Sequence, residues 1–412
     1  MESEKIFGLA LGLIVPWKVS KVELKNASSV QKQELHLFLD YPRPHKFKVA
    51  IEGVDQECGV YDHVERSWKH LNFFQHECYL HASVPRVKTS SGKIITVDVP
   101  WARPQSGFTL LFEAFCLTLL KCGMSMTKAG EIVGEDGKKL CRILRHYIDK
   151  ALVEQDLEPI SKLGIDETSI AKGHVYMTVA TDMERKKVVG ISKGKDMFAF
   201  GAAIGEIEQR NASIADIKAI AMDMSVPFTA AASELLPDAQ IVYDRFHLEM
   251  VVSKAVDSVR RIEQSLNKDL RNSKYIYLRN ESRLTDKQLQ RLHYLNESFP
   301  SLGEAHRLKE QFKEIWKNPV KQNALEALNE WMRMAAQSEI FPMINAVKTF
   351  KAHWSGIISY FDYLLTSGFV ERVNLSIQEI KRTAKGYTNF DNFRAMIFLR
   401  LGKLELNITH YK

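Results

Sequence analysis

Residues 162–182, KLGIDETSIAKGHVYMTVATD, hold an apolar run that ends in two acids and leads into a hairpin pattern. The apolar run is predicted to end a buried strand and to deliver Asp166 to the edge of a sheet. Turn-forming residues at 171–173, followed by β-branched and aromatic residues at 175–181, predict an antiparallel partner strand. Because a third strand is expected at 188–191, Asp166 is placed on the first strand of a three-stranded meander.

An aspartate at the end of a buried strand is not by itself a catalytic group, because chains re-enter water at such places and acids are common there. Clustered carboxylates are different, since they repel one another unless a cation neutralises them. A catalytic role for Asp166 therefore depends on other carboxylates that reach the same part of the fold.

Two further acids end short apolar segments downstream. After a helix expected at 198–210, the segment IKAIAM at 217–222 is predicted to be a short buried strand that ends in Asp223. A predicted helix and the strand AQIVYD follow, and this strand ends in Asp244. A strand, a helix and a strand at this spacing predict parallel neighbours joined by a right-handed crossover.

The rest of the chain is predicted to be almost wholly helical. Residues 248–366 contain no convincing strand pattern, which indicates a helical insertion between two parts of the sheet domain. A helix is then expected at 369–384, with another apolar helix after it. Glu371, Asn374 and Gln378 are three and four residues apart and share one face of the first of these helices.

The order of three strands, a helix, a strand, a helix and a strand resembles the RNase H-like fold, an α/β class built on a mixed sheet. In that order the first and fourth strands are neighbours, so Asp166 and Asp223 are expected to meet, with Glu371 completing the set. Three carboxylates around one cavity can hold two divalent ions about 4 Å apart, an arrangement suited to phosphodiester chemistry. Hard oxygen ligands favour Mg²⁺ or Mn²⁺ over zinc.

The N-terminal part is predicted to be a small β-rich module. Residues 17–50 hold alternating segments separated by polar or proline-containing turns, which indicates an antiparallel sheet. A group of potential zinc ligands follows: Cys58, His63, His70, His76, Cys78 and His81. Neither cysteine has a second cysteine two or three residues away, which favours core cysteines and hydrogen-bonded histidines over a bound metal.

Two helices around a glycine-containing break predict a helix-turn-helix. An apolar segment from Phe108 continues at helical spacing to Val133, residues 134–137 break it, and residues 138–148 resume the helix. The second helix is amphipathic and basic, with Lys138, Lys139, Arg142, Arg145 and His146. The pattern is typical of DNA binding, and a plain helical hairpin with a solvated basic face is the alternative.

Composition indicates a globular chain rather than a membrane or disulfide-rich one. The 412 residues suffice for two or three domains, and 45% hydrophobic and 26% charged residues are ordinary values. No run of about 18 uncharged apolar residues occurs, and acids before the first apolar stretch argue against a signal peptide.

Five cysteines, an odd number, favour a reducing cytoplasm. The net charge of +7 makes a polyanionic partner plausible without requiring one.

Several segments together resemble bacterial insertion-sequence DDE transposases of the ISL3 family. They are VPWARPQSGFTLLFEAF, GIDETSIAKGHVY, AMDMSVPF with LLPDAQIVYDRFHLE, and SGFVERVNLSIQEIKRTAKGYTNFDNFR. The resemblance runs from about Ile6 to the C-terminus. It implies a recombinase that recognises the inverted repeats at an element's ends, hydrolyses a phosphodiester there, and joins the free 3′-hydroxyl to target DNA.

The resemblance also implies roles for individual residues. It assigns catalysis and the binding of two Mg²⁺ or Mn²⁺ ions to Asp166, Asp223 and Glu371. Asp244 and His247 match a D-x-x-H signature, to which we assign a structural or DNA-contacting role. Residues predicted to bind DNA are Lys138, Lys139, Arg142, Arg145, Arg372, Lys381 and Arg382.

One departure from the family pattern concerns zinc. Relatives usually carry cysteine pairs before and after a segment that resembles RSWKHL. Here Asp55 stands where the partner of Cys58 would be, and Thr89–Ser91 stand where the later cysteines would be. We therefore expect the fold of the module without stoichiometric zinc.

The predicted organisation has five parts and one nucleic-acid partner. The parts are a zinc-ribbon-like module at 1–105, a helix-turn-helix at 106–155, the first part of the RNase H-like core at 156–250, the insertion at 251–364, and final core helices at 365–412. We expect a homo-oligomer on DNA, associated with the bacterial nucleoid, with no membrane contact. An RNase H-like nuclease acting on RNA or branched DNA, and a catalytically inactive DNA-binding derivative, remain as alternatives.

Overall fold

The computed structural model describes residues 3–26, 33–51, 54–318, 320–365 and 368–408. The chain divides into two compact units, which are described separately below. The first unit comprises Met1–Leu152, Ile380–Arg400 and Leu404–Lys412, and the second comprises Val153–Glu379 and Leu401–Lys403. Across the described ranges, no helix is long and apolar enough to cross a membrane.

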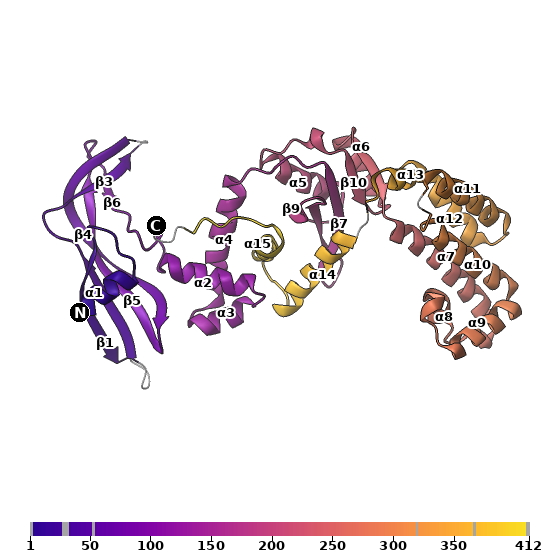
Figure 1. Cartoon of the computed structure of the whole chain (residues 1–412), viewed down its shortest axis with the longest axis horizontal. Coiled ribbons are helices and arrows are strands. Elements are labelled where there is room, and N and C mark those ends of the chain that lie inside the picture. The colour runs from indigo at the N-terminus through magenta and orange to yellow at the C-terminus, as the bar shows by residue number, and fades with distance from the viewer. Residues whose placement is uncertain (1–2, 27–32, 52–53, 319, 366–367, 409–412) are drawn as a thin grey trace. The chain divides into compact units, whose positions relative to one another are not determined.

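A short helix, α1 (Ser3–Ala10), and a six-stranded sheet open the first unit (Figure 1). The strands run in the order β1-β2-β5-β4-β3, with β6 beside β5. Their bounds are β1 (Lys18–Asn26), β2 (Gln33–Asp40), β3 (Lys46–Ile51), β4 (Val54–Phe73), β5 (His76–Lys88) and β6 (Ile94–Thr96).

The antiparallel pairing expected within residues 17–50 is confirmed for β1 with β2, but the sheet as a whole is mixed, which was not expected. Strands β2 and β5 pair in parallel, whereas the β4–β5 hairpin pairs antiparallel over most of its length. The long hairpin was not predicted, because its cysteines and histidines drew attention to metal binding. Its pattern is nevertheless that of a strand: in β5 Cys78, Leu80 and Ala82 are buried, and the residues between them are partly exposed.

Three helices follow the sheet in the first unit. They are α2 (Leu110–Lys121), α3 (Met126–Val133) and α4 (Gly137–Glu154). Ser125 caps α3 by accepting a hydrogen bond from the Lys128 amide, and Gly134 ends α3 with φ 66°, a conformation that favours glycine. Helix α4 runs six residues beyond the predicted end at Ile148, because its apolar stripe continues to Ala151.

The last helix, α15 (Phe390–Leu401), lies largely in the first unit, although we expected residues 365–412 to belong to the core. Arg400 explains this placement, since its Nε and Nη2 atoms donate to the carbonyls of Leu120 and Met124, each at 3.0 Å. A guanidinium at the C-terminal end of α2 satisfies carbonyls that have no partner within that helix.

The second unit contains a mixed five-stranded sheet in the order β11-β10-β7-β8-β9. The strands are β7 (Lys162–Ala171), β8 (Val175–Asp182), β9 (Lys187–Lys193), β10 (Ala219–Met222) and β11 (Gln240–Tyr243). The predicted meander and the parallel pairing of β10 with both β7 and β11 are confirmed.

Strand β7 is longer than predicted, so Asp166 does not end it. The parallel pairing with β10 stops at Gly164, but β7 continues to Ala171 because it still pairs with β8, with Asp166 opposite Val179. Asp166 therefore lies two residues beyond the last β7 residue that pairs with β10. The Asp166 side chain has room there to face a pocket.

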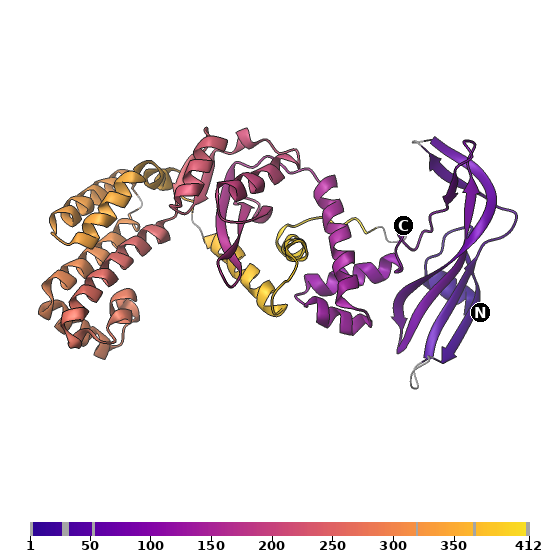
Figure 2. The same ribbon diagram turned by 180° about the vertical axis from the view of Figure 1, so that it is seen from behind.

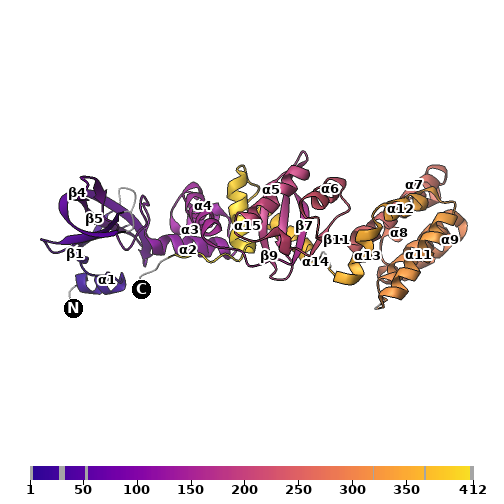
Figure 3. The ribbon, with the colours of Figure 1, turned by 90° about the horizontal axis from the view of Figure 1, so that it is seen from above.

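Helices cover both faces of this sheet (Figure 3). Leu163 and Ile165 share a core with residues of α5 (Met197–Glu208) and α6 (Val226–Leu235). Side chains alternate along a strand, so Gly164 faces the other way, toward Val370 of α14 (Gly368–Thr383). Asp166 shares the Gly164 face, which places it beside α14.

The segment between β11 and α14, where a helical insertion was predicted, is helical (Figure 2). Its longest members are α7 (Arg245–Leu266), α9 (Asp286–Ser298), α10 (Pro300–Ile315), α11 (Lys321–Gln337), α12 (Phe341–Ala352) and α13 (Trp354–Tyr363), with the short α8 (Lys274–Leu278) between α7 and α9. Phe312, Trp331 and Phe350 are buried together at its centre. Helix α13 packs on β11, where Gly356 lies against the ring of Tyr243.

Gly164 is the contact that allows α14 to approach β7, and it provides a test of this packing. A Cβ added there would lie 2.7 Å from both Thr181 Oγ1 and Val370 Cγ2. We therefore expect Gly164→Ala to lower the free energy of unfolding by about 1–3 kcal/mol, the usual range for overpacking. Chemical denaturation measures this change.

Gly205→Ala is the matched control, because a Cβ added on helix α5 at Gly205 meets no atom within 4 Å. Alanine is the better helix former, so this variant is expected to be as stable as the parent chain or slightly more stable. Equal unfolding free energies for the two variants would contradict the tight approach of α14.

Candidate catalytic site

Three aspartates stand at the same level on three neighbouring parallel strands. Gly164 of β7 is opposite Ala221 of β10, and Met222 of β10 is opposite Tyr243 of β11. Asp166, Asp223 and Asp244 follow these residues at one edge of the sheet. Since neighbouring strands are about 4.8 Å apart, Asp223 is the close neighbour of Asp166, and Asp244 is one strand further out.

Asp166 is held by two hydrogen bonds. Its Oδ2 accepts from Asn374 Nδ2 at 2.6 Å, and its Oδ1 accepts from the Glu167 amide at 2.7 Å. Burial, together with the nearby charge of Asp223, raises the pKa of Asp166 to about 7. A cation binds such a carboxyl group readily, because its positive charge offsets both the cost of burying the carboxylate and the repulsion from Asp223.

His247 bridges the other two aspartates. Its Nδ1 lies 2.8 Å from Asp223 Oδ1 and 3.3 Å from Asp244 Oδ2. Hydrogen bonds to Asp223 and then Asp244 raise the pKa of His247 to about 10, so the ring is an imidazolium at neutral pH. Asp244 is almost fully buried and is the N-cap residue of α7, so the D-x-x-H motif adjoins the acids directly.

A pocket of about 290 Å³ opens beside these groups. Sequence reasoning missed two of its charged residues, Glu167 and Lys254. Glu167 follows Asp166 directly, and Lys254 lies at helical spacing from His247 along α7, so spacing alone could have indicated both. The lining residues are Asp166, Glu167, Asp223, Met224, Ser225, Phe228, His247, Met250, Val251 and Lys254.

The polar face of α14 contacts β7, as its spacing indicated. Gln378 Nε2 donates to Thr168 Oγ1 at 2.8 Å and to the Ser169 carbonyl at 2.9 Å, one turn beyond the contact between Asn374 and Asp166. Glu371 is on the same helix, one turn before Asn374, but it is exposed and does not line the pocket. The structure therefore brings together two of the three predicted carboxylates.

The residues present fit a hard divalent cation. Asp166 and Asp223 supply carboxylate oxygens to one pocket. Asn374 Oδ1 is buried without a hydrogen-bond partner, so a carbonyl-type oxygen is also available next to Asp166. Carboxylate and amide oxygens suit Mg²⁺ and Mn²⁺. Among the side chains that the structure describes, no group of three His, Cys, Asp or Glu is yet arranged around a single point.

The N-terminal module does not fit a zinc ion. Cys58 and Cys78 are buried free thiols, and burial raises the pKa of Cys78 to about 12. The turn that would carry the later cysteines is held by hydroxyl groups instead: Thr89 Oγ1 lies 2.9 Å from Ser91 Oγ, and Ser90 Oγ donates to Gln56 at 3.0 Å.

The histidines near these cysteines are hydrogen-bonded, as expected. His63 pairs with the Tyr41 hydroxyl and His70 with the Thr109 hydroxyl, each at 2.8 Å. His81 lies between Ser67 and His36.

The predicted DNA-binding residues lie on two helices. Lys138, Lys139, Arg142 and Arg145 are exposed on α4. Arg372 and Arg382 are exposed on α14, and Lys381 is partly buried on the same helix. The α4 group occupies adjacent turns of one helix, whereas Arg372 is nine residues away from Lys381 on α14.

Comparison with known proteins finds three transposase family models that match successive parts of this chain. A transposase family model of ISL3 type matches residues 163–397. A helix-turn-helix domain of transposase family ISL3 matches residues 97–148, and a zinc-finger model of the transposases of IS204, IS1001, IS1096 and IS1165 matches residues 55–88.

Two curated transposases are similar to the chain. The transposase for insertion sequence element IS1001 of Bordetella parapertussis is 29% identical over 248 residues, which cover 58% of this chain and 61% of that protein. The transposase for insertion sequence element IS1557 of Mycobacterium tuberculosis is 25% identical over 367 residues, or 82% of this chain and 81% of the relative. The chain thus matches about three fifths of the first relative's length.

The raised pKa of Asp166 predicts a pH-dependent stability. Its ordinary value is 3.8 and its value in the folded chain is about 7, so the folded state binds this proton more tightly. Stability from this group is therefore full below about pH 4 and is lost as the pH rises through about 7. Asn cannot ionise, so the Tm of Asp166→Asn should exceed that of the parent chain by a margin that grows from about pH 5 to about pH 8.

Thermal denaturation in a chelator measures this margin, and added magnesium should raise the Tm of the parent chain more than that of the variant. A margin that is the same at both pH values would show that Asp166 is not an uncharged acid at low pH in the fold.

The N-terminal module is predicted to hold no stoichiometric zinc, because hydroxyl groups and Asp55 occupy the places of thiolates. Elemental analysis of the purified chain should give far less than one zinc per molecule, and a zinc chelator should leave its Tm unchanged. A content of about one zinc per chain would contradict the prediction.

Proposed function

The chain belongs to the ISL3 family of transposases, and on that basis we propose that it binds the terminal inverted repeats of an insertion sequence and catalyses metal-dependent strand cleavage and strand transfer. One observation carries the chemical part of the proposal. Asp166 of β7 and Asp223, which directly follows β10, are level on adjacent parallel strands and line the same pocket. Clustered, partly buried acids are what two divalent ions require in phosphodiester chemistry.

The strand order supports an RNase H-like core for this activity. An antiparallel meander, β7-β8-β9, is extended on its first strand by the parallel strands β10 and β11. That arrangement puts an acid of the first strand beside an acid of the fourth, and helix α14 closes over the same edge.

We assign metal binding to Asp166, Asp223 and Glu371. Glu371 is exposed one turn before Asn374, whose side chain already touches Asp166. Its carboxylate would join the two aspartates when a cation replaces the repulsion between them with attraction. The ions, when bound, would activate the attacking oxygen and stabilise the leaving oxygen of the phosphodiester.

The surrounding residues prepare the acids for this task. Asn374 fixes the orientation of Asp166 through a 2.6 Å hydrogen bond. The His247 imidazolium neutralises Asp223 and Asp244 and ties α7 to the sheet edge. Lys254 lines the pocket and is exposed, so its ammonium can meet a phosphate of the DNA. Phe228 and Val251 line the remaining wall and limit water.

Helix α4 supports the recognition of DNA ends. It is the second helix of the helix-turn-helix, it is long, and its exposed face is basic. Such a helix enters the major groove in related motifs. Two DNA ends must be joined in one reaction, so we propose that the working form is a homo-oligomer on DNA.

The catalytic assignment is tested with amide variants. Asp166→Asn, Asp223→Asn and Glu371→Gln should abolish cleavage and joining of DNA that carries the element's ends, while binding of those ends stays close to the parent level. Only metal coordination is lost in these variants, because the amide keeps the shape of the carboxylate. Gel assays of cleavage and joining, with and without magnesium, measure the outcome.

Asp244→Asn is the matched control, because Asp244 lies one strand further out and is paired with His247. We expect reduced but measurable cleavage. An inactive Asp244→Asn beside an active Asp223→Asn would require the triad to be redrawn around Asp244. Cleavage of RNA or branched DNA without any joining would favour a nuclease instead.

A further inference from the structure

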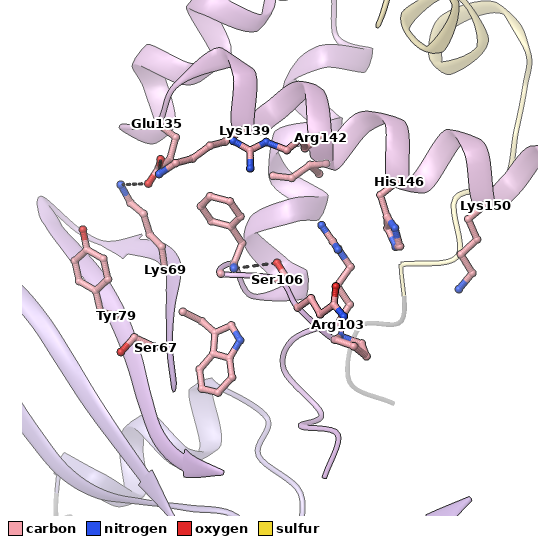
Figure 4. A pocket seen from close by; sticks show the side chains of 16 residues that line it. Ser67, Lys69, Tyr79, Arg103, Ser106, Glu135, Lys139, Arg142, His146 and Lys150 are labelled. Carbon is pink, nitrogen blue, oxygen red and sulfur yellow. Dashed lines mark hydrogen bonds and ion pairs between the residues drawn. The ribbon is translucent and has the colours of Figure 1, made fainter. Parts of the chain in front are cut away.

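The first unit contains a second pocket that the catalytic proposal does not use. It has a volume of about 950 Å³ and lies between strands β4 and β5, the segment 103–108 and helix α4 (Figure 4). Its charged lining residues are Lys69, Arg103, Glu135, Lys139, Arg142 and Lys150, and His146 also lines it. The lining thus carries five cations against one acid.

The sheet side of this pocket is rigid. Lys69 is 5% exposed, and its Nζ donates to the Gly134 carbonyl at 2.9 Å and pairs with Glu77 at 3.2 Å and Glu135 at 3.3 Å. This lysine therefore ties β4 to the turn between α3 and α4. The cost of burying its charge is met by two carboxylates and a carbonyl.

The segment 103–108 is fixed in a similar way. Arg103 Nε donates to both carboxylate oxygens of Glu113 at 3.0 Å. Glu113 is fully buried and also accepts hydrogen bonds from Ser106 and Tyr147, each at 2.7 Å. The pocket is consequently formed before any ligand arrives, so binding requires little ordering of the protein.

Helix α4 supplies positive charge that can still pair with an anion. Lys139 pairs with Glu135 at 2.6 Å, but Arg142 has no hydrogen-bond or ion-pair partner within the part of the chain that the structure describes. Burial, and then the charge of Arg103, lower the pKa of His146. The five cations and one acid of the lining leave an excess of positive charge. An anion in the pocket would relieve that excess.

The cations form a row rather than a single cluster. Lys139, Arg142, His146 and Lys150 line one flank of α4, with eleven residue steps from the first to the last. At 1.5 Å per residue the row is about 16 Å long, the length of about five base pairs of duplex DNA at 3.4 Å each. A free phosphate or nucleotide would use only part of such a row.

We propose that this pocket holds the sugar–phosphate backbone of duplex DNA between α4 and the N-terminal sheet. The idea rests on the proposed function, because it takes the DNA bound by α4 as its ligand. Arg142 and Lys150 contact phosphates, and Ser67 and Gln105 offer further polar groups on the opposite wall. Lys138 and Arg145 are exposed on α4 but do not line the pocket, so they can reach base edges.

The assignment divides the residues of α4 into two classes with different signatures. A phosphate contact strengthens binding to every sequence by a similar factor and steepens the salt dependence of binding, whereas a base contact favours one sequence. The N-terminal module would thereby act as one wall of a DNA clamp.

The test measures the affinity of the full chain for two duplexes of equal length, one with the element's end and one scrambled, in a chelator at several salt concentrations. Arg142→Gln and Lys150→Gln should each weaken binding of both duplexes several-fold. Each should also lower the slope of log K against log salt by about 0.9. Arg145→Gln should weaken the element's end more than the scrambled duplex.

Lys121→Gln is the matched control, since Lys121 is an exposed lysine on α2 outside this pocket, and it should leave both affinities unchanged. The Tm of each variant shows that it is folded. An unchanged slope for Arg142→Gln and Lys150→Gln would overturn the clamp.

Inorganic pyrophosphate gives a further arm. If it raises the Tm of the parent chain but not of Arg142→Gln, while the DNA slopes stay equal, the pocket takes a small anion and the clamp is also overturned. Cleavage by the parent chain is assayed separately, so a failure of the clamp is distinguishable from a failure of the transposase reaction.

Discussion

Repulsion between carboxylates at the edge of one sheet is the constraint on which the second unit depends. Asp166 lies within β7, and Asp223 and Asp244 directly follow β10 and β11, so the parallel strands bring neighbouring charges within a few ångströms of one another. The fold offsets this repulsion with the proton on Asp166 and with the His247 imidazolium between the other two. A divalent cation bound at the proposed site would offset the same repulsion.

The neighbours come from distant parts of the chain. Helix α7 starts at the site with His247 and leads into the insertion, and α14 returns from the insertion to place Asn374 on Asp166. Gly164 permits that return, because any side chain there would collide with Val370. The long insertion thus lies between two helices that both contact the acidic edge.

In the first unit, a hydrophobic core supplies the stabilisation that a bound metal supplies in smaller modules. Zinc is needed where a fold is too small to bury enough apolar surface. Here Trp17, Trp68 and Trp101 pack edge to face at the centre of a six-stranded sheet. A core of this size can hold the fold of the module, in which Asp55 stands where the partner of Cys58 would be and Thr89–Ser91 stand where the later cysteines would be.

Local patterns in the sequence predicted the meander, the crossover strands, the helical segment after β11 and the positions of Asp166 and Asp223. Apolar runs that end in acids can be recognised in the sequence without knowing which elements pack together. Tertiary structure alone decided which groups meet there. The contact between Asn374 and Asp166 joins residues 208 positions apart, and no spacing rule reaches that far. Three further features could not be predicted for the same reason: the bridge made by His247, the exposed position of Glu371 and the attachment of α15 to α2. Each depends on packing between elements. The pattern of a sequence shows only which face of each element is apolar.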